Sequence, residues 1–422
     1  MTPIYKSLFQ TLTIAFIALS VISCGGSSSS DGVSDTPGST SSALNAGAGS
    51  PSSAMGDCDA STSGVNWDAL MDSNCPNLSD YNLFMDEADP TAGPNKGGVP
   101  YDLSVPLFTD HASKYRFVFV PEGMTATYSE AEVMDFPVGT VLVKTFAMPE
   151  NTAFRDGTEL VIETRLLIHR AAGWIALPYY WDPVDNGADA RLAALGEDIP
   201  NMTTNHNGED LDFTYSVPDW TACTSCHGKL SPGKSTFIPI GPKARFLNKD
   251  YTYENAQVAN QLSYWAEGGI LDGLPADMAT VMETPLFDDT VVASSLSSNE
   301  LHDTAKAYLD VNCAHCHRNE LTLGTGFSGP AGSSGLQVEY NRAYADDPTK
   351  FGTCKVAVAG GHAEYPYDVI PQDSGNSYLL FRMNTNDSRH RMPELGRATI
   401  HNEGVALIAA WIDSLPAASC TP

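Results

Sequence analysis

The chain has 422 residues, 42% of them hydrophobic, which is enough for two or three domains with real cores. It contains 23 Lys and Arg against 51 Asp and Glu, and its formal net charge is −28. This charge argues against binding to a phosphate backbone and favours cationic or metal-containing partners.

The N-terminal segment has the pattern of an export signal. One early Lys6 precedes an apolar run over 8–22, which is too short for a membrane span and stops at Cys24. The letters "VISC" resemble a bacterial lipobox, so we expect cleavage after residues 1–23 and lipidation of Cys24. An ordinary signal peptide is the alternative. Residues 24–57 are rich in Gly, Ser, Pro and Ala and predict a flexible tether.

A β-rich region is expected over 58–215. It contains one short helical candidate near 78–88, ahead of its strands. Its segments alternate or run apolar and are rich in Val, Ile, Phe, Tyr and Trp, which is typical of strands. The four clearest are 115–120, 139–146, 159–169 and 174–181. Residues 169–174 predict a hairpin connection with Gly173 at its end. We expect a sandwich or compact barrel.

Helical patterns dominate after 217–220. We expect helices over 255–271, 297–313 and 401–416. Ser297 and Glu300 have capping-box spacing, and Asn402 is the expected cap of the last helix, with Val405, Ile408, Ala409, Ile412 and Leu415 forming its apolar stripe. The chain is thus expected to be an α+β multidomain protein, with two mainly helical domains at 216–292 and 293–422.

Two C-x-x-C-H motifs, Cys223–Cys226–His227 and Cys313–Cys316–His317, are the strongest chemical signal. This is the attachment signature of haem c: two thiols reach the vinyl groups of a porphyrin, and the next residue places an imidazole at the iron. A four-thiolate zinc site is disfavoured because the two pairs lie much further apart than the roughly 15–20 residues of a zinc ribbon. A thioredoxin-like dithiol would need a βαβ unit, which the sequence lacks. His315 is expected to point to solvent.

An electron-transfer haem usually has a second axial ligand, commonly Met or His. For the second motif the candidate is Met392, which precedes Pro393 in a loop ahead of the final helix, with His390 as the rival. For the first motif several residues stay open, or the site has no second ligand. The possible ligands are Met278, Met202, His206 and His169, while Met282 and the expected surface residue His302 are weaker.

Four cysteines remain outside the motifs and Cys24. Proximity along the chain favours disulfides Cys58–Cys75 and Cys354–Cys420, and crossed pairings are possible.

The order of these features resembles the two-haem c-type cytochromes of Gram-negative bacteria that carry an N-terminal β-rich domain. The resemblance covers most of the chain over 78–416. It rests on stretches such as "VPYDLSVPLFTDHASKYRFVFVPEG" (99–123), "ETRLLIHRAAGWIALPYYWD" (163–182), "CTSCH" (223–227), "AYLDVNCAHCHR" (307–318) and "RMPELGRATIHNEGVALIAAWIDSLP" (391–416). It implies haem at both motifs, Met392 as the distal ligand of the second, and a C-terminal staple between Cys354 and Cys420.

The resulting functional prediction is an exported di-haem cytochrome that carries single electrons between protein partners in the periplasm or at the outer membrane. Its expected cofactors are two covalently bound haem c groups. Nucleic acid is not an expected partner, and the membrane is expected to be reached only through the lipid anchor at Cys24. Two alternatives stay open. One is a di-haem peroxidase-like enzyme, and the other is the haem electron acceptor of a periplasmic dehydrogenase.

Overall fold

A computed structural model describes residues 44, 48–52, 56–60, 63–155, 158–182, 188–231, 234–319, 328–358 and 364–420. The predicted signal segment, Cys24 and most of the predicted tether lie outside these ranges. Residues Ser41–Pro422 form one compact unit. Within the described part of the chain, no helix is both long and apolar enough to cross a membrane.

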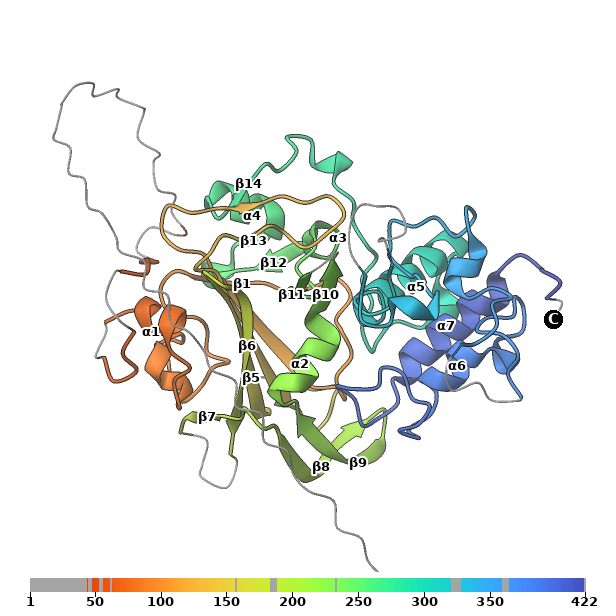
Figure 1. The fold of residues 1–422 in the computed structure, drawn as a ribbon, viewed down its shortest axis with the longest axis horizontal. Helices are drawn as coiled ribbons and strands as arrows, with labels where there is room; N and C mark the ends of the chain where they lie inside the picture. Colours follow the sequence, from red (N-terminus) through yellow and green to blue (C-terminus); the bar gives the residue numbers. More distant parts are fainter. Residues whose placement is uncertain are drawn as a thin grey trace, which may run out of the picture. The chain divides into compact units, whose positions relative to one another are not determined.

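The protein is of the mixed α+β class, with a six-stranded antiparallel sheet in its N-terminal half and a few helices later (Figure 1). The sheet is open, so the first and the last strand in the spatial order given next are its edge strands. That order is β1 (Gly98–Pro100), β2 (Ser113–Phe119), β4 (Val141–Met148), β5 (Leu160–Arg170), β6 (Gly173–Trp181) and β7 (Ala190–Leu192). The four predicted strands are confirmed as β2, β4, β5 and β6.

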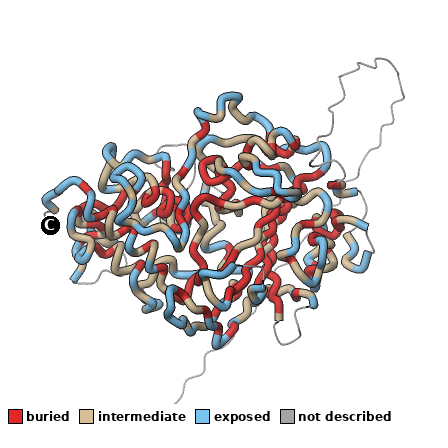
Figure 2. The backbone as a smooth tube through the Cα atoms, turned by 180° about the vertical axis from the view of Figure 1, so that it is seen from behind, coloured by how far each residue is buried: buried red, intermediate tan, exposed pale blue. Residues whose placement is uncertain are grey.

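Both faces of this sheet are buried (Figure 2). This explains why the strand sequences contain continuous apolar runs as well as stretches in which apolar and polar residues alternate. Seven of the eight residues of β4 are buried. One face packs against the N-terminal helices α1 (Trp67–Asp72) and η1 (Leu78–Tyr81). The opposite face, represented by Val118 and Leu142, joins a core that continues into the later helices. Of the helix expected near 78–88, only the short 3-10 helix η1 forms.

Two hairpins show how local sequence fixes the turns. Arg170 pairs with Gly173 at the β5–β6 turn, and Gly173 has φ +118°, which confirms the expected connection. The hairpin of β8 (Glu197–His206) and β9 (Glu209–Val217) was not predicted. Its turn is Asn207-Gly208, both at positive φ, and this dipeptide is a strong hairpin signal.

The other described strands form four two-stranded sheets. One of them is the β8–β9 hairpin described above. The other three are β3 (Ala126–Thr127) with β14 (Leu271–Asp272), β10 (Gly228–Ser231) with β11 (Lys234–Phe237), and β12 (Asp250–Thr252) with β13 (Val258–Asn260).

The later helices are α2 (Trp220–His227), α3 (Ala244–Leu247), α4 (Gln261–Glu267), α5 (Ser298–Asn312), α6 (Tyr378–Met383) and α7 (Asn402–Ser414). The α5 prediction is confirmed: Ser297 and Glu300 form the reciprocal capping box. The helix expected over 255–271 is shorter than predicted: α4 begins after Asn260, whose side chain accepts from two backbone N–H groups, and ends before Gly268.

One detail of α7 was predicted wrongly. Asn402 is exposed and is the first helical residue, so it is not the cap; His401 precedes the helix and gives no side-chain cap. The buried face of α7 is centred on Leu407, Ile408, Trp411 and Ile412. Of the expected stripe, Ile408, Ile412 and Leu415 are buried, whereas Val405 and Ala409 are only partly so.

Both expected disulfides are present, Cys58–Cys75 and Cys354–Cys420. The four cysteines of the C-x-x-C-H motifs form no disulfide.

Candidate functional site

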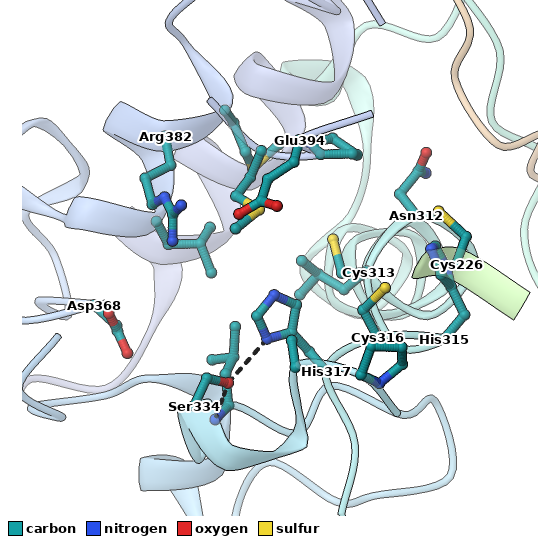
Figure 3. Close-up of a pocket in the computed structure, with 18 of the residues that line it drawn as sticks. Cys226, Asn312, Cys313, His315, Cys316, His317, Ser334, Asp368, Arg382 and Glu394 are labelled. Carbon is teal, nitrogen blue, oxygen red and sulfur yellow. Dashed lines mark hydrogen bonds between the residues drawn. The ribbon is translucent and has the colours of Figure 1, made fainter. Parts of the chain in front are cut away.

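A cavity of about 450 Å³ lies between the turn that follows α5 and the segment carrying α6 and the loop after it (Figure 3). Its wall includes Cys313, Cys316 and His317 on one side and Met392 on the other. The structure thus brings Met392 to the same cavity as the second motif. Nine further wall residues are apolar: Leu309, Pro330, Ala331, Leu336, Val358, Leu379, Met383, Pro393 and Leu395.

Helix α5 delivers the second motif to this cavity. Cys313 is its C-cap, with its backbone N–H bonded to Leu309 O at 2.9 Å. His317 N bonds to Cys313 O at 2.8 Å, which closes the motif into a tight turn. Asn312 holds the helix end from the sheet side, because its buried Oδ1 accepts from Phe108 N at 2.9 Å. The motif's geometry is therefore set by a helix anchored at both ends.

His317 is arranged as a ligand. Its Nδ1 lies 3.0 Å from the Ser334 hydroxyl, which fixes the ring and leaves Nε2 as the nitrogen available to a metal ion (Figure 3). Burial lowers the pKa of His317 to about 4, so the imidazole is neutral at pH 7 and can donate its lone pair. Burial raises the pKa of the Cys313 thiol to about 12.

The loop that carries Met392 is organised by one buried arginine. Arg397 donates from Nε to Met392 O at 3.1 Å and from Nη2 to Thr385 O at 2.8 Å. Met392 N in turn bonds to Arg382 O at 2.8 Å. Both backbone groups of Met392 are therefore hydrogen-bonded, and the residue lines the cavity.

The rival of Met392 does not reach this wall. His390 lies near Tyr378, with its Nδ1 3.3 Å from the phenol oxygen, and is absent from the cavity lining within the described chain. A second thioether does line the cavity, that of Met383 at the end of α6. Sequence reasoning missed it, because it lies within a short helix with no motif around it.

The first motif forms the last turn of α2. Asp219 caps this helix, and its carboxylate accepts from Ala222 N at 2.6 Å. His227 Nδ1 donates to Ile238 O at 2.7 Å, and its ring stacks on Phe237 with centroids 4.7 Å apart. Burial lowers the pKa of His227 to about 4 and raises that of Cys223 to about 11. The first motif therefore also presents a neutral imidazole whose Nδ1 is engaged.

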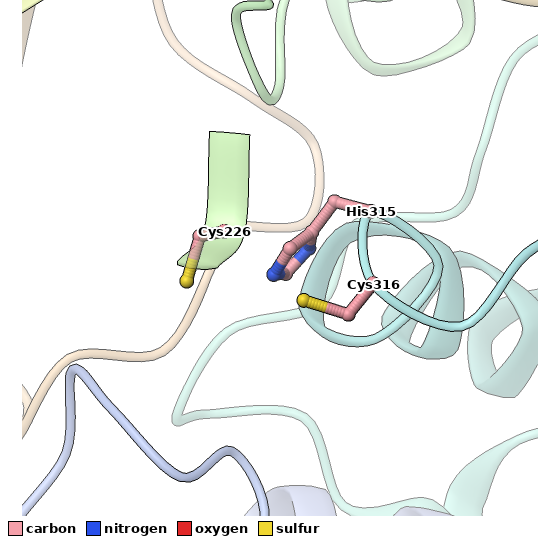
Figure 4. A group of neighbouring side chains, drawn as sticks. All are labelled: Cys226, His315 and Cys316. Carbon is pink, nitrogen blue, oxygen red and sulfur yellow. The ribbon is translucent and has the colours of Figure 1, made fainter. Parts of the chain in front are cut away.

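The two motifs meet in space (Figure 4). Ligand atoms of Cys226, His315 and Cys316 all lie within 4.8 Å of one another. The Cys316 Sγ lies 3.4 Å from Ser225 O, and a thiol proton donated by Cys316 to Cys226 instead would lower the pKa of the Cys226 thiol. The expectation that His315 points to solvent is wrong. Its ring is half-buried beside both thiols, and its Nδ1 is buried without a hydrogen bond.

None of the open candidates for the first motif lines the described cavity. His169 bonds through Nδ1 with Phe136 O at 2.9 Å and stacks on Trp174, and His206 belongs to a separate buried cluster. Met202 is buried near the β8–β9 hairpin, and Met278 lies in η4 (Met278–Thr280). His302 is half-buried and accepts from Trp411 Nε1 at 3.3 Å, so it is not a plain surface residue.

Chemically, each motif offers two thiols for covalent attachment of a group and one neutral imidazole for its metal. The second motif adds a thioether across the cavity. Comparisons of the chain with protein-family models, with curated proteins and with solved structures found no match.

Proposed function

We propose that the protein is an exported di-haem c-type cytochrome that passes single electrons between protein partners in the periplasm or at the outer membrane. One observation carries the proposal: Cys313, Cys316, His317 and Met392 line one cavity. Two thiols for attachment, with an imidazole and a thioether as axial ligands, are the donor set of a cytochrome c. When bound, haem supplies a one-electron iron couple.

The cavity suits this group in size and polarity. Its volume of about 450 Å³ is within the range of cofactor sites, and Leu309, Leu336 and Leu379 give it apolar walls. Arg382 provides a cation at the wall opposite the motif turn, where a haem carboxylate could be neutralised (Figure 3). Lys355, also at the wall, is already paired with Asp368 at 2.6 Å.

Cys223, Cys226 and His227 would hold the second group of the pair. The contact between Cys226 and Cys316 supports this reading, because two groups attached there would share a border. Electron tunnelling falls steeply with distance, so such a border favours transfer between the groups. In this proposal His315 fills the space between the two attachment points. The residue that completes the first site is left open.

The rest of the chain would serve delivery and docking. Residues 216–292 and 293–422 would be the two haem domains. The sheet-bearing part over 58–215 would orient them or dock a partner. Lipidation at Cys24 would hold the protein at the outer membrane. A net charge of −28 would steer cationic partners and make their association salt-dependent.

The test is a haem count on protein produced with haem-attachment machinery. Intact mass and the pyridine haemochrome spectrum should give two haems per chain. The Cys223→Ala/Cys226→Ala and Cys313→Ala/Cys316→Ala variants should each retain one, and the matched control Cys58→Ala/Cys75→Ala should keep two. One haem or none in the wild-type chain would overturn the proposal.

Carbon monoxide separates the proposed role from an enzymatic one. For an electron carrier, both reduced irons should stay six-coordinate and should not bind carbon monoxide. Stoichiometric binding at the first motif would instead favour the peroxidase-like alternative, since an open iron position is what peroxide chemistry needs.

A further inference from the structure

A second cluster of ligating side chains lies outside both C-x-x-C-H motifs. It gathers His111, His206, Asp289, His401 and Glu403, which are far apart in sequence. The three histidines are only 3%, 5% and 8% exposed. His111 and His206 stack with ring centroids 3.8 Å apart. The proposal above uses none of these residues, and nothing in this inference depends on haem.

His401 is the centre of the cluster. Its Nε2 lies 3.4 Å from Asp289 Oδ1 and 3.9 Å from Glu403 Oε2. Two ligands that each lie ~2.1 Å from one metal ion are separated by about 3.0–3.4 Å. The Asp289–His401 spacing therefore already matches two ligands of one ion, and the Glu403 oxygen needs to move by only about half an ångström.

The second oxygen of each carboxylate is held by another histidine. Asp289 Oδ2 accepts from His111 Nδ1 at 3.0 Å, and Glu403 Oε1 lies 3.0 Å from His206 Nε2. These bonds orient the free oxygens toward His401. Hydrogen-bonded partners that fix metal ligands in this way are typical of metal sites in proteins.

His401 is itself oriented. Its Nδ1 lies 3.0 Å from the Tyr308 hydroxyl, and its ring stacks on Phe108 with centroids 4.2 Å apart.

Two atoms at the centre of the cluster lack what a closed hydrogen-bond network would give them. His401 Nε2 and Glu403 Oε2 are buried and make no hydrogen bond. Unsatisfied buried polar atoms are uncommon and cost about 1–3 kcal/mol each. Arg155 lies 3.3 Å from Asp289 Oδ2. The cluster therefore holds two buried polar atoms without a hydrogen bond beside the carboxylates of Asp289 and Glu403.

We propose that Asp289, His401 and Glu403 bind one divalent first-row transition-metal ion, of which zinc is the representative, with His111 and His206 orienting the two carboxylates. Imidazole combined with carboxylate oxygen is a donor set that these ions accept well. The ion would bind His401 Nε2 and Glu403 Oε2 and would place a positive charge beside the two carboxylates. His401 also lines a small cavity together with Cys313 and Met392, so the ion would lie close to the main cavity.

The test uses the full-length protein after dialysis against a chelator. Calorimetric titration with ZnCl₂ and with CoCl₂ should show one tight site per chain, and zinc should raise the melting temperature. The near-isosteric variants Asp289→Asn and Glu403→Gln should weaken zinc binding at least 100-fold. His302→Gln, which changes a histidine outside the cluster, should bind like the wild type.

Cys226, His315 and Cys316 form the rival zinc site, so His315→Gln is the second control. Tight binding that survives His315→Gln but not Asp289→Asn supports the proposal. Binding lost in His315→Gln, or retained in both carboxylate variants, overturns it. A wild-type chain whose calorimetry and melting temperature do not respond to either ion overturns it as well, even if the variants fail to fold.

Discussion

The most direct test of how the fold holds the second motif is the substitution Asp310→Asn. Asp310 lies on α5, three residues before Cys313, and its side chain is fully buried. Its Oδ1 accepts from Lys243 Nζ at 3.0 Å, and its Oδ2 accepts from Arg245 Nη2 at 2.7 Å. The pair of cations comes from the α3 region, so this cluster ties that region to α5.

Asparagine keeps the shape of Asp310 but removes the carboxylate that pairs with the buried Lys243 and Arg245. Removing one partner of a buried ion pair costs about 3–5 kcal/mol. We therefore expect the free energy of unfolding, measured in urea at pH 7, to fall by about 3–5 kcal/mol. The matched control is Asp303→Asn on the same helix, a half-buried residue that should change stability by roughly 0.5 kcal/mol or less.

The same cluster predicts a pH dependence. Burial alone would raise the pKa of Asp310, but the charges of Lys243 and Arg245 outweigh it and lower the pKa from an ordinary 3.8 to about 2. A group whose pKa is lowered by folding stabilises the protein above its unfolded pKa, and this contribution is lost as the pH falls through the folded pKa. The difference in the free energy of unfolding between wild type and Asp310→Asn should therefore be largest at pH 7 and should decrease from about pH 4 toward pH 2. A loss below about 1 kcal/mol at pH 7, or no narrowing in acid, would refute the reasoning.

Two further predictions concern the cavity and the disulfides. In the haem-loaded protein, Met392→Leu should remove the near-infrared sulfur-to-iron band while haem stays attached. The control variants Met383→Leu and His390→Gln should keep this band. Loss of the band in Met383→Leu alone would assign the ligand to α6. Replacing Cys354 and Cys420 by serine should cost about 4 kcal/mol in urea unfolding, and the same change at Cys58 and Cys75 about 3, because the closed loops span 66 and 17 residues. The reverse order would contradict this loop-entropy reasoning.

Sequence reasoning succeeded where one local pattern decides the structure. The strands β2, β4, β5 and β6 follow from apolar alternation, and the start of α5 follows from the reciprocal pair Ser297 and Glu300. Capping boxes and strand periodicity act over a few residues, so no knowledge of the tertiary fold is needed to read them. The second motif and Met392, which a five-residue signature and a Met-Pro pair single out in the sequence, lie at one cavity, and their role as a haem site stays a prediction.

Reasoning from the sequence failed where distant segments meet. His315 was expected in solvent because its motif was considered alone, and the structure places Cys226 of the other motif against it. The cluster around His401 consists of five residues from four separate segments, so no spacing of residues in the sequence predicts it. Asn402 was assigned as a cap from its type, but the helix begins one residue earlier than that rule implies, and His401 is held by Tyr308 instead.

Helix α5 connects all of these features. Tyr308, Asp310 and Cys313 lie within six positions and, at 3.6 residues per turn, project in different directions. Tyr308 contacts His401 of the proposed metal cluster, Asp310 binds the cations of the α3 region, and Cys313 opens onto the main cavity. A small rotation of α5 would therefore disturb three sites at once. The reciprocal cap at its start and the Asn312 bond to Phe108 at its end both oppose such a rotation.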